Sequence, residues 1–365
     1  MALLGPSDLQ SLGLPALWDL AEMKKVELAD GTTFDAMIRD VQAALSMLNG
    51  ELLTAPHYGD LVAVQDNVEV EYPVGVANGV DEATEYGTPT PKRGATTGHN
   101  IPIRPYDRAL GWTMMYLRNA RRNKLSADVR SMFTDARSHY QQKVLTRFFK
   151  MEAEIVGATA GASVPFADGA VADANYVPLD STEGEAFLSS HDHYLRLTPY
   201  DAAAVATAVE HLQEHGHQSP FDMVASRADA TTIRAITGWK SPEWAGIVYH
   251  ASASERAALG GITDYFGYLE TAYGIVRVWL TPRLPTNYFA IFKAYGPQDR
   301  RAPLRLRINR RVGFGWQLVP GNWIAAPQTM AVGYSEFGVG IGEDRTNGVF
   351  TLIAAAGDYI TPTIS

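Results

Sequence analysis

Apolar and polar positions follow two different periods along this chain, and each period predicts a different kind of element. Residues 34–48 place apolar side chains at helical spacing after Thr33, which can cap a helix. A longer helical pattern starts at Ser126 and continues to Ile155 without proline or glycine. At 1.5 Å per residue, this helix would be on the order of 45 Å long. We expect it to bury one apolar face.

A third helix is predicted from Thr198 to Gly216, with Pro199 at its first position and the glycine as its stop. A short strand over residues 221–225 and a helix over residues 229–236 follow. The pattern then changes to strands, which are expected over residues 275–280, 288–293, 304–308 and 349–354. Helices followed by a run of strands predict an α+β fold.

The segment before the long helix has a different character. Residues 61–76 alternate in their middle between apolar and polar side chains, as in a half-exposed strand. Residues 77–105 contain four glycines and four prolines and show no periodicity. Because a segment of this length without regular structure is unusual in a compact domain, we expect an extended functional arm or disorder.

The 365 residues are too many for one hydrophobic core, so we expect two or three interleaved units.

The distribution of charge along the chain is more informative than the net charge. A net charge of −9 argues against a protein that coats nucleic acid with a wholly basic surface. Residues 1–91 hold 15 acidic and 3 basic residues, whereas residues 104–150 hold 3 acidic and 11 basic ones. Residues 299–311 hold six arginines and one aspartate. These blocks are solvated faces, or they pair within a chain or between copies.

The residues that most often carry chemistry form no recognisable site. The absence of cysteine excludes disulfides, thiolate metal sites and cysteine nucleophiles. Histidines occur in two groups, His191 and His193 around Asp192, and His211 with His215 and His217. Because thiolates and a clear third ligand are missing, these groups predict capping and surface roles. We predict no metal site and no cofactor.

A glycine-rich sequence and the missing hydrolase signatures argue against an enzyme. Gly338, Gly340 and Gly342 lie in GVGIGEDRTNG, which superficially resembles a phosphate-binding loop. This sequence lacks both the following helix of a dinucleotide fingerprint and the Gly-Lys-Ser/Thr of a Walker loop, so it predicts a strand and a turn. No Gly-x-Ser-x-Gly elbow supports serine catalysis. No catalytic residues are therefore predicted.

Two further features concern packing and location. Trp316 and Trp323, in GFGWQLVPGNW, are candidates for packing between subunits. The N-terminal residues lack the pattern of a secretory signal, and no stretch reaches the roughly 20 apolar residues that a membrane-spanning helix needs. We therefore expect a soluble chain that is not exported.

Four sequence segments follow one another in an order that resembles a known family. They are ATEYGTPTPKRGATTGHNIPIRPYDRALGWT (residues 83–113), YQQKVLTRFF within the long helix, the set TPYDAAAVATAVEHLQEHGH, FDMVAS and ADATTIRAI, and GYLETAYGIVRVWLTPRLPTNYFAIF (residues 267–292). In this order the chain resembles the major capsid protein of tailed bacteriophages, whose fold encapsulin shells share. The resemblance extends from about residue 61 to the end and rests on element order.

The resemblance implies a division of the chain. Its parts are an N-terminal arm (residues 1–60), an extended E-loop (61–115), a peripheral domain with the spine helix (116–194), an axial domain (195–325) and return strands of the peripheral domain (326–365). Some family members crosslink an E-loop lysine to an asparagine of a neighbour. Lys92 lies at the loop tip, but neither the asparagine nor the assisting glutamate can be matched, so no crosslink is predicted.

The resemblance also implies a function. The chain would self-assemble into pentamers and hexamers of an icosahedral shell that encloses double-stranded viral DNA, and it would be assembled in the host cytoplasm and reside in the virion. The implied partners are other copies of the chain, a separate scaffolding protein, a portal, a decoration protein and packaged DNA bound non-specifically, with no membrane. Acidic residues 1–91 would lie over basic residues 104–150 of neighbouring subunits. The alternatives are an encapsulin-type compartment and, more distantly, a β-rich hydrolase or binding protein.

Overall fold

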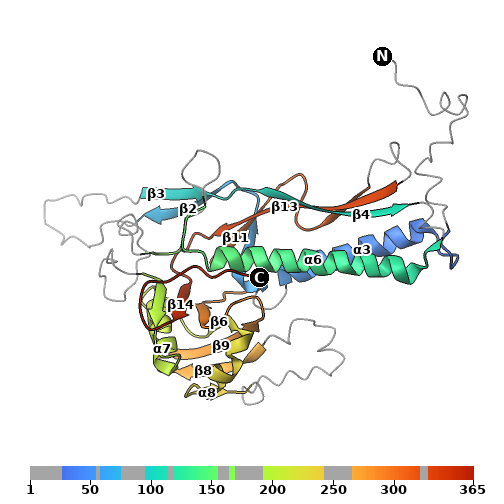
Figure 1. The fold of residues 1–365 in the computed structure, drawn as a ribbon. Helices are drawn as coiled ribbons and strands as arrows, with labels where there is room; N and C mark the ends of the chain where they lie inside the picture. Colours follow the sequence, from blue (N-terminus) through green and yellow to red (C-terminus); the bar gives the residue numbers. More distant parts are fainter. Residues whose placement is uncertain are drawn as a thin grey trace, which may run out of the picture. The chain divides into compact units, whose positions relative to one another are not determined.

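In a computed structural model of the chain, the described residues form two compact units (Figure 1). They are residues 27–54, 58–74, 95–113, 119–154, 164–168, 192–241, 265–320 and 328–365. The first unit is drawn from Met1–Leu52, Arg104–Tyr140 and Asn309–Phe337, and the second from Leu53–Ile103, Gln141–Ile308 and Gly338–Ser365. Both units combine helices with strands, which confirms the predicted α+β fold class.

Two helices of the first unit begin at capped residues. Helix α3 (Phe34–Thr54) starts where predicted, and Thr33 Oγ1 accepts a hydrogen bond from Ala36 N at 3.3 Å. Helix α6 (Arg122–Phe148) is the predicted long helix, and its 27 residues span about 40 Å. It begins before Ser126, because Asp30 Oδ2 accepts a hydrogen bond from Arg122 N at 2.8 Å and so caps the helix from a distant part of the sequence.

The C-terminal end of α6 also differs from the prediction, since the helix ends at Phe148 and not at Ile155. The guanidinium of Arg147 is almost fully buried there and donates hydrogen bonds to the carbonyl oxygens of Lys150 and Glu152. These carbonyls therefore face a side chain instead of the next helical turn. Periodicity alone cannot reveal this stop, because the apolar spacing continues past it.

Each of these helices buries one apolar stripe, as the periodicity predicts. On α3 the stripe consists of Val41, Leu45, Leu48 and Leu52, and on the first-unit part of α6 of Leu125, Val129, Met132, Ala136 and Tyr140. None of these side chains is more than 7% exposed. Burying a large apolar side chain contributes roughly 1.5–3 kcal/mol, so the stripes supply much of the stability of this unit.

The sheet of the first unit is organised around one long strand. Strand β13 (Gln328–Ile341) pairs antiparallel with β4 (Arg104–Thr113) along one edge and with β12 (Gln317–Pro320) along the other. Of these three strands, only the glycine-rich end of β13 is predicted from the sequence. Glycines within β13 lower its intrinsic strand preference, and pairing with two neighbours overrides that preference.

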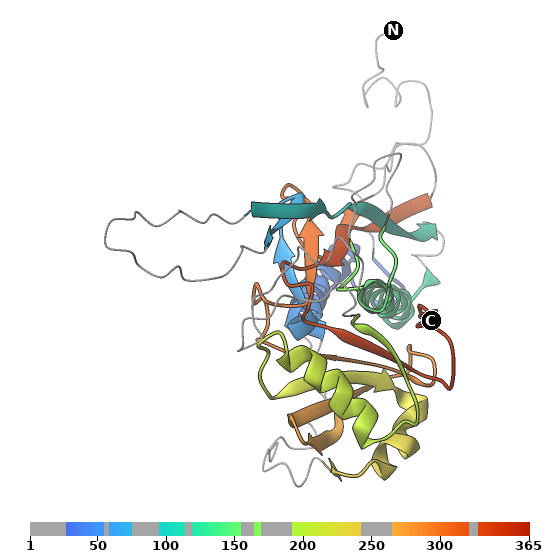
Figure 2. The ribbon, with the colours of Figure 1, turned by 90° about the vertical axis from the view of Figure 1, so that its left-hand side faces the viewer.

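The second unit is built on a seven-stranded sheet in the order β5-β14-β10-β6-β9-β8-β7. Its strands are β5 (Tyr194–Leu197), β6 (Phe221–Ser226), β7 (Trp239–Lys240), β8 (Tyr265–Thr271), β9 (Gly274–Thr281), β10 (Tyr288–Phe292) and β14 (Val349–Ile353). Helix α7 (Ala202–Gln213) crosses one face of this sheet (Figure 2) and buries Val205, Val209 and Leu212 in the shared core. The strands predicted around residues 221–225, 275–280, 288–293 and 349–354 are all confirmed.

Helix α7 starts later than predicted and ends where predicted. The helix begins three residues later than predicted, because its N-cap is Asp201, whose carboxylate accepts a hydrogen bond from Ala204 N at 3.0 Å, and not Thr198. Gly216 follows the helix with a φ of +79°, a conformation that favours glycine and confirms the predicted stop. Helix α8 (Ala230–Ala235), preceded by a 3-10 turn, confirms the helix predicted over residues 229–236.

Four further strands belong to the second unit. After the short helix α4 (Tyr58–Leu61), strand β1 (Val62–Gln65) pairs parallel with β11 (Leu304–Ile308), a strand that forms where predicted and that neighbours β13 in the same five-stranded sheet. Strands β2 (Glu69–Val74) and β3 (Ala95–Asn100) form an antiparallel hairpin. Part of the segment expected to lack regular structure, residues 77–105, is therefore strand; residues 75–94 lie outside the described ranges.

An aromatic cluster fixes the end of α6 within the second unit. Phe148 meets the rings of Phe149, Phe166, Phe292 and Phe350 edge-on, at centroid separations of 4.8 to 5.8 Å. Edge-to-face pairs of this kind are worth about 0.5–1.5 kcal/mol each beyond their buried area.

The division of the chain into five parts, which the resemblance implies, remains a prediction. Within the described ranges, no helix combines the length and the apolar character that crossing a membrane requires.

Candidate functional site

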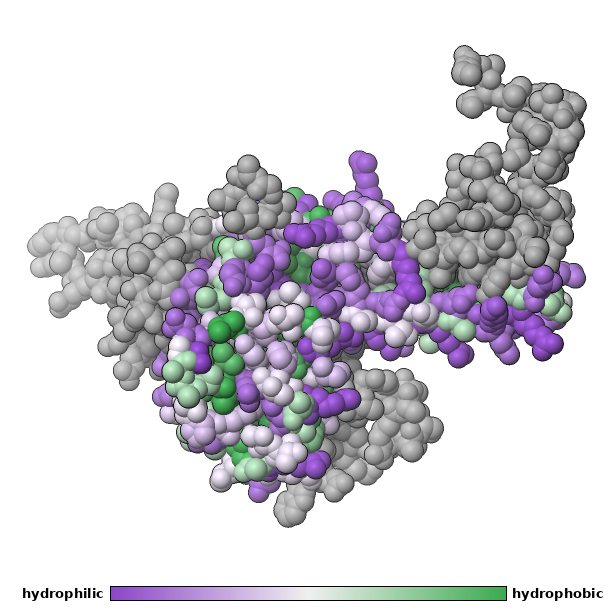
Figure 3. Space-filling model, viewed as in Figure 1, coloured by the Kyte–Doolittle hydropathy of each residue, from purple (hydrophilic) through white to green (hydrophobic). Residues whose placement is uncertain are grey.

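The acidic and basic blocks of the sequence meet inside the first unit. Asp40 and Glu51 of α3 form ion pairs with Arg122 and Arg137 of α6. All four side chains are about half exposed, and the visible surface over these helices is largely hydrophilic (Figure 3). For these residues the opposite charges pair within one chain and not between copies. The acidic residues of segments 1–26 and 75–91 lie outside the described ranges.

The glycine-rich sequence is a strand followed by an internally bonded turn, as predicted. Gly338 and Gly340 belong to β13, and the turn begins after Ile341. Within the turn, Arg345 Nε donates to Pro165 O at 2.9 Å, and Asn347 Oδ1 accepts a hydrogen bond from Lys293 N at 2.7 Å. These side chains hold other segments of the second unit together. Their bonding to the protein gives the turn a structural role and not that of a phosphate loop.

Four of the histidines lie around the end of α7: His193, His215, His217 and His211, whose ring centroid is 6.1 Å from that of His193. His193 is fully buried; its Nδ1 lies 2.8 Å from Gly348 O and its Nε2 lies 3.0 Å from His215 Nε2. A carbonyl oxygen only accepts hydrogen bonds, so Nδ1 of His193 carries a proton; in the neutral form of that ring, Nε2 accepts a hydrogen bond from His215. His217 lies nearby, with Nε2 3.4 Å from Asp344 Oδ2. Burial lowers the pKa of His217, which favours its neutral form.

These histidines act as hydrogen-bonding groups that connect α7 to the turn after β13. Among the residues that the structure describes, no group of three or more histidine, aspartate or glutamate side chains is placed to hold a metal ion. His191 lies outside that part of the chain. The His193–His215 contact joins residues 22 positions apart, which a search for metal-ligand spacing does not anticipate.

A buried ion pair crosses β6 and β9 of the second unit. Asp222 is fully buried and accepts hydrogen bonds from Nε and Nη2 of Arg277, both at 2.6 Å, and from Trp279 Nε1 at 3.1 Å. Burial raises the pKa of Asp222, and the arginine opposes that rise. A carboxylate with this many donors is held in one position. Because all three of these donors belong to β9, Asp222 ties β6 to β9.

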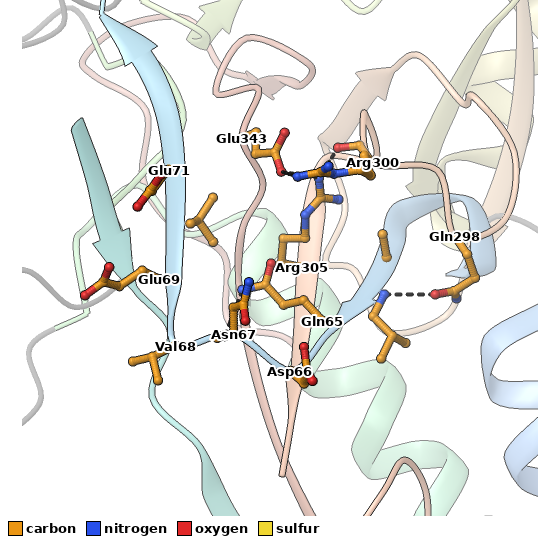
Figure 4. Close-up of a pocket in the computed structure, with 13 residues that line it drawn as sticks. Gln65, Asp66, Asn67, Val68, Glu69, Glu71, Gln298, Arg300, Arg305 and Glu343 are labelled. Carbon is orange, nitrogen blue, oxygen red and sulfur yellow. Dashed lines mark hydrogen bonds and ion pairs between the residues drawn. The ribbon is translucent and has the colours of Figure 1, made fainter. Parts of the chain in front are cut away.

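The second unit contains a polar cavity of about 750 Å³ (Figure 4). One wall is formed by residues 63–71, from β1, β2 and their connection, and the other by Gln298, Arg300, Arg305 and Glu343. Gln298 Oε1 accepts a hydrogen bond from Val64 N at 2.9 Å and so ties the two walls together. The cavity therefore lies at the base of the β2–β3 hairpin.

Both walls of the cavity carry charge, with Asp66, Glu69 and Glu71 on the first and Arg300, Arg305 and Glu343 on the second. Glu343 Oε1 lies 2.9 Å from Arg300 Nη2 and 3.5 Å from Arg305 Nη2. Burial lowers the pKa of Arg305, and the glutamate opposes that change. Glu69 and Glu71 also line the cavity, but they project from β2 on the side away from Arg305 (Figure 4). No motif indicates this site, because its walls are more than 200 positions apart in the sequence.

Two other positions singled out in the sequence have different outcomes. Trp316 is buried in the first unit, where its backbone N and O bond to the Asn49 amide at 2.9 and 3.0 Å. It packs within the chain, so the prediction that it packs between subunits is wrong. Trp323 and Lys92 lie outside the described residues.

Comparison with solved structures identifies the fold. Over 94% of each chain, the protein matches a structure from Mycobacterium phage Patience with a TM-score of 0.60 and 20% sequence identity. The chain has the tailed-phage major capsid protein fold. The capsid of Ralstonia phage GP4 matches over 83% of this chain and 92% of that one, with 11% identity and a TM-score of 0.45. No protein-family description and no curated protein sequence matches the chain.

The fold expected from the sequence resemblance is thus confirmed. That resemblance depends on the order of elements, and at 20% identity the Patience structure agrees with this chain mainly in that order. The fold alone does not define an activity, because function depends on the sites that a fold carries.

Proposed function

We propose that this chain is the major capsid protein of a tailed bacteriophage. Copies of it self-assemble into pentamers and hexamers, which form an icosahedral shell around double-stranded viral DNA. The observation that carries the proposal is the match to the Patience phage structure over 94% of both chains, because so complete a match leaves little of the chain for a different task. In this account the protein is structural and not an enzyme, and it resides in the virion after assembly in the host cytoplasm.

The β2–β3 hairpin supports a role in assembly. It is a two-stranded sheet, and within the described residues only Val70 and Ile101 form a buried apolar cluster there. An isolated two-stranded hairpin is marginally stable in water and needs packing against other elements. Neighbouring copies in a shell would supply that packing, and contacts repeated over many copies would offset the entropy lost when the hairpin is ordered.

The remaining partners of the proposed shell follow from the same account. A separate scaffolding protein, a portal and a decoration protein would contact the assembled shell, and packaged DNA would meet its inner surface non-specifically. The net charge of −9 limits contact with DNA to local basic patches.

Sedimentation velocity and negative-stain microscopy of the purified full chain test the proposal. We expect species much larger than the 39.8 kDa monomer, seen as closed shells, rings of five or six copies, or tubes. A chain that remains monomeric across a range of salt and protein concentrations, or forms only irregular aggregates, would contradict it.

A further inference from the structure

Arg305 is a buried cation with an incomplete set of hydrogen-bond acceptors. The residue is only 2% exposed. Its Nη2 donates to Arg300 O and faces Glu343, whereas Nη1 has no acceptor among the residues that the structure describes. Leaving a buried charged donor unsatisfied is costly, and such groups usually have a partner. This unsatisfied donor lines the cavity at the base of the hairpin.

Close to the Arg305 guanidinium, two cations face one carboxylate. The same oxygen of Glu343 faces both Arg300 and Arg305, so one carboxylate serves two guanidinium groups. Arg300 is 84% exposed and can reorient toward the cavity at little cost. Three further carboxylates line the first wall of the cavity. Asp66 lies toward the end opposite the Arg305 guanidinium, and Glu69 and Glu71 point to the other side of β2 (Figure 4).

The side-chain amide of Gln298 is a neutral hydrogen-bond donor on the same wall as Arg300 and Arg305. Gln298 uses its side-chain oxygen to accept a hydrogen bond from Val64, which leaves the amide nitrogen as a donor on the same wall. A ligand that contacts these donors must accept hydrogen bonds, and a negative charge on it would pair with the guanidinium groups of Arg300 and Arg305. Planar guanidinium groups bind carboxylates and phosphates particularly well, because two parallel N–H groups match two oxygens.

We propose that this cavity is a binding site for an oxyanion, held by Arg305 Nη1 together with Arg300. The group that binds is a carboxylate or a phosphate, and two sources can supply it. One is an aspartate or glutamate side chain of a second copy of this chain, and the other is a free ion. The site stands on the geometry of the second unit and does not require that the chain form a shell.

The first arm of the test measures free-ion binding to the dispersed full chain. Inorganic phosphate is titrated by calorimetry at constant ionic strength into the wild type, Arg305→Lys, Arg300→Gln and Arg311→Gln. Arg305→Lys keeps the charge but removes the planar fork, and we expect about tenfold weaker binding. Arg300→Gln should weaken binding about threefold, because its guanidinium is exposed. Arg311→Gln is the matched control: it removes an exposed arginine of the same basic run outside the cavity and should leave binding unchanged.

The second arm measures self-association of the same four proteins by sedimentation velocity, with and without phosphate. If a carboxylate of a second copy is the ligand, Arg300→Gln should weaken association more than Arg311→Gln does, and phosphate should compete with association in the wild type. Phosphate binding without an effect on association identifies a free ion as the ligand. If phosphate does not bind and association responds equally to Arg300→Gln and Arg311→Gln, the proposal is wrong. That result would leave the proposed shell function unaffected, since shells could still form.

Discussion

The two units use the same kind of ion pair in opposite environments. In the first unit, Arg122 and Asp40 join α6 to α3 with side chains that are 52% and 57% exposed. In the second, Arg277 and Asp222 join β9 to β6, and the aspartate is fully buried. Exposed pairs typically contribute about 0–1 kcal/mol, whereas removing one partner of a buried pair costs about 3–5 kcal/mol.

The comparison shows which charges fix the structure and which adjust to their surroundings. The pairs between α3 and α6 lie over apolar stripes that already hold the helices, so the charges mainly set register and solubility. The buried pair holds neighbouring strands at the centre of a sheet, and its carboxylate has no access to water, although Arg277 is 32% exposed. Salt should therefore weaken the pairing in the first unit and leave that in the second nearly unchanged.

The largest effect is expected for removal of the buried carboxylate. Asp222→Ala leaves both Arg277 and Trp279 Nε1 without their acceptor, so we expect the free energy of unfolding to fall by about 3–5 kcal/mol. The matched control, Asp40→Ala, removes an exposed carboxylate and should cost less than about 1 kcal/mol. Urea denaturation of the unassembled chain measures both. If the free energy of unfolding fell equally in the two variants, the distinction between the buried and the exposed ion pair would be contradicted.

A second buried group should make stability depend on pH. His99 lies on β3 with Nε2 3.1 Å from Ile341 O, and burial, reinforced by the nearby charge of Arg147, lowers the pKa of His99 to about 4. Below pH 6.5 the unfolded chain binds a proton at this histidine that the folded chain does not bind until about pH 4. Stability is therefore lost as the pH falls through this window, by about 3 kcal/mol.

The variant His99→Gln tests whether His99 causes this loss of stability at low pH. Glutamine keeps a donor for Ile341 O but does not titrate, so the loss of stability between pH 6.5 and pH 4 should shrink by most of that amount. Denaturation midpoints measured across this range check it. An unchanged pH dependence in His99→Gln would show that other groups carry the acid sensitivity.

The smallest effect concerns the exposed pair of Glu51 and Arg137. Glu51→Gln should change stability by about 0.5 kcal/mol or less at low salt, and the difference from wild type should vanish in 0.5 M salt, where the Debye length falls to roughly 4 Å. Thermal denaturation at two salt concentrations measures it. A larger loss that persists in high salt would mean that this pair behaves like the buried one.

The sequence predicts best those elements whose stabilising contacts are local. The strands around residues 275–280 and 304–308 and helix α7 form close to their expected positions, since their apolar periodicity matches the faces they bury. The start of α6 is missed because its cap is Asp30, 92 positions away. Strand β13 is missed except at its glycine-rich end, because pairing with β4 and β12, and not its own residues, determines its conformation.

The candidate site lies beyond what a single sequence can indicate. The basic run over residues 299–311 is visible as a charge block, but its arginines separate in the structure. Arg301 pairs with Asp299, whereas Arg305 turns into the cavity beside Glu343. The strand period does not decide which of the six arginines is buried, because Arg307 lies two positions after the buried Arg305 and is only partly buried. Residues 63–71 on the opposite wall decide it, so only the folded chain assigns these roles.

The central claim is that this chain builds a shell from many copies of itself, and cryo-electron microscopy of the assembled full chain tests it most directly. The account predicts closed particles whose reconstruction contains rings of five and six copies, with both units and the β2–β3 hairpin recognisable in every copy. A reconstruction in which the chain is a monomer, or a small oligomer without five-fold or six-fold rings, would contradict it.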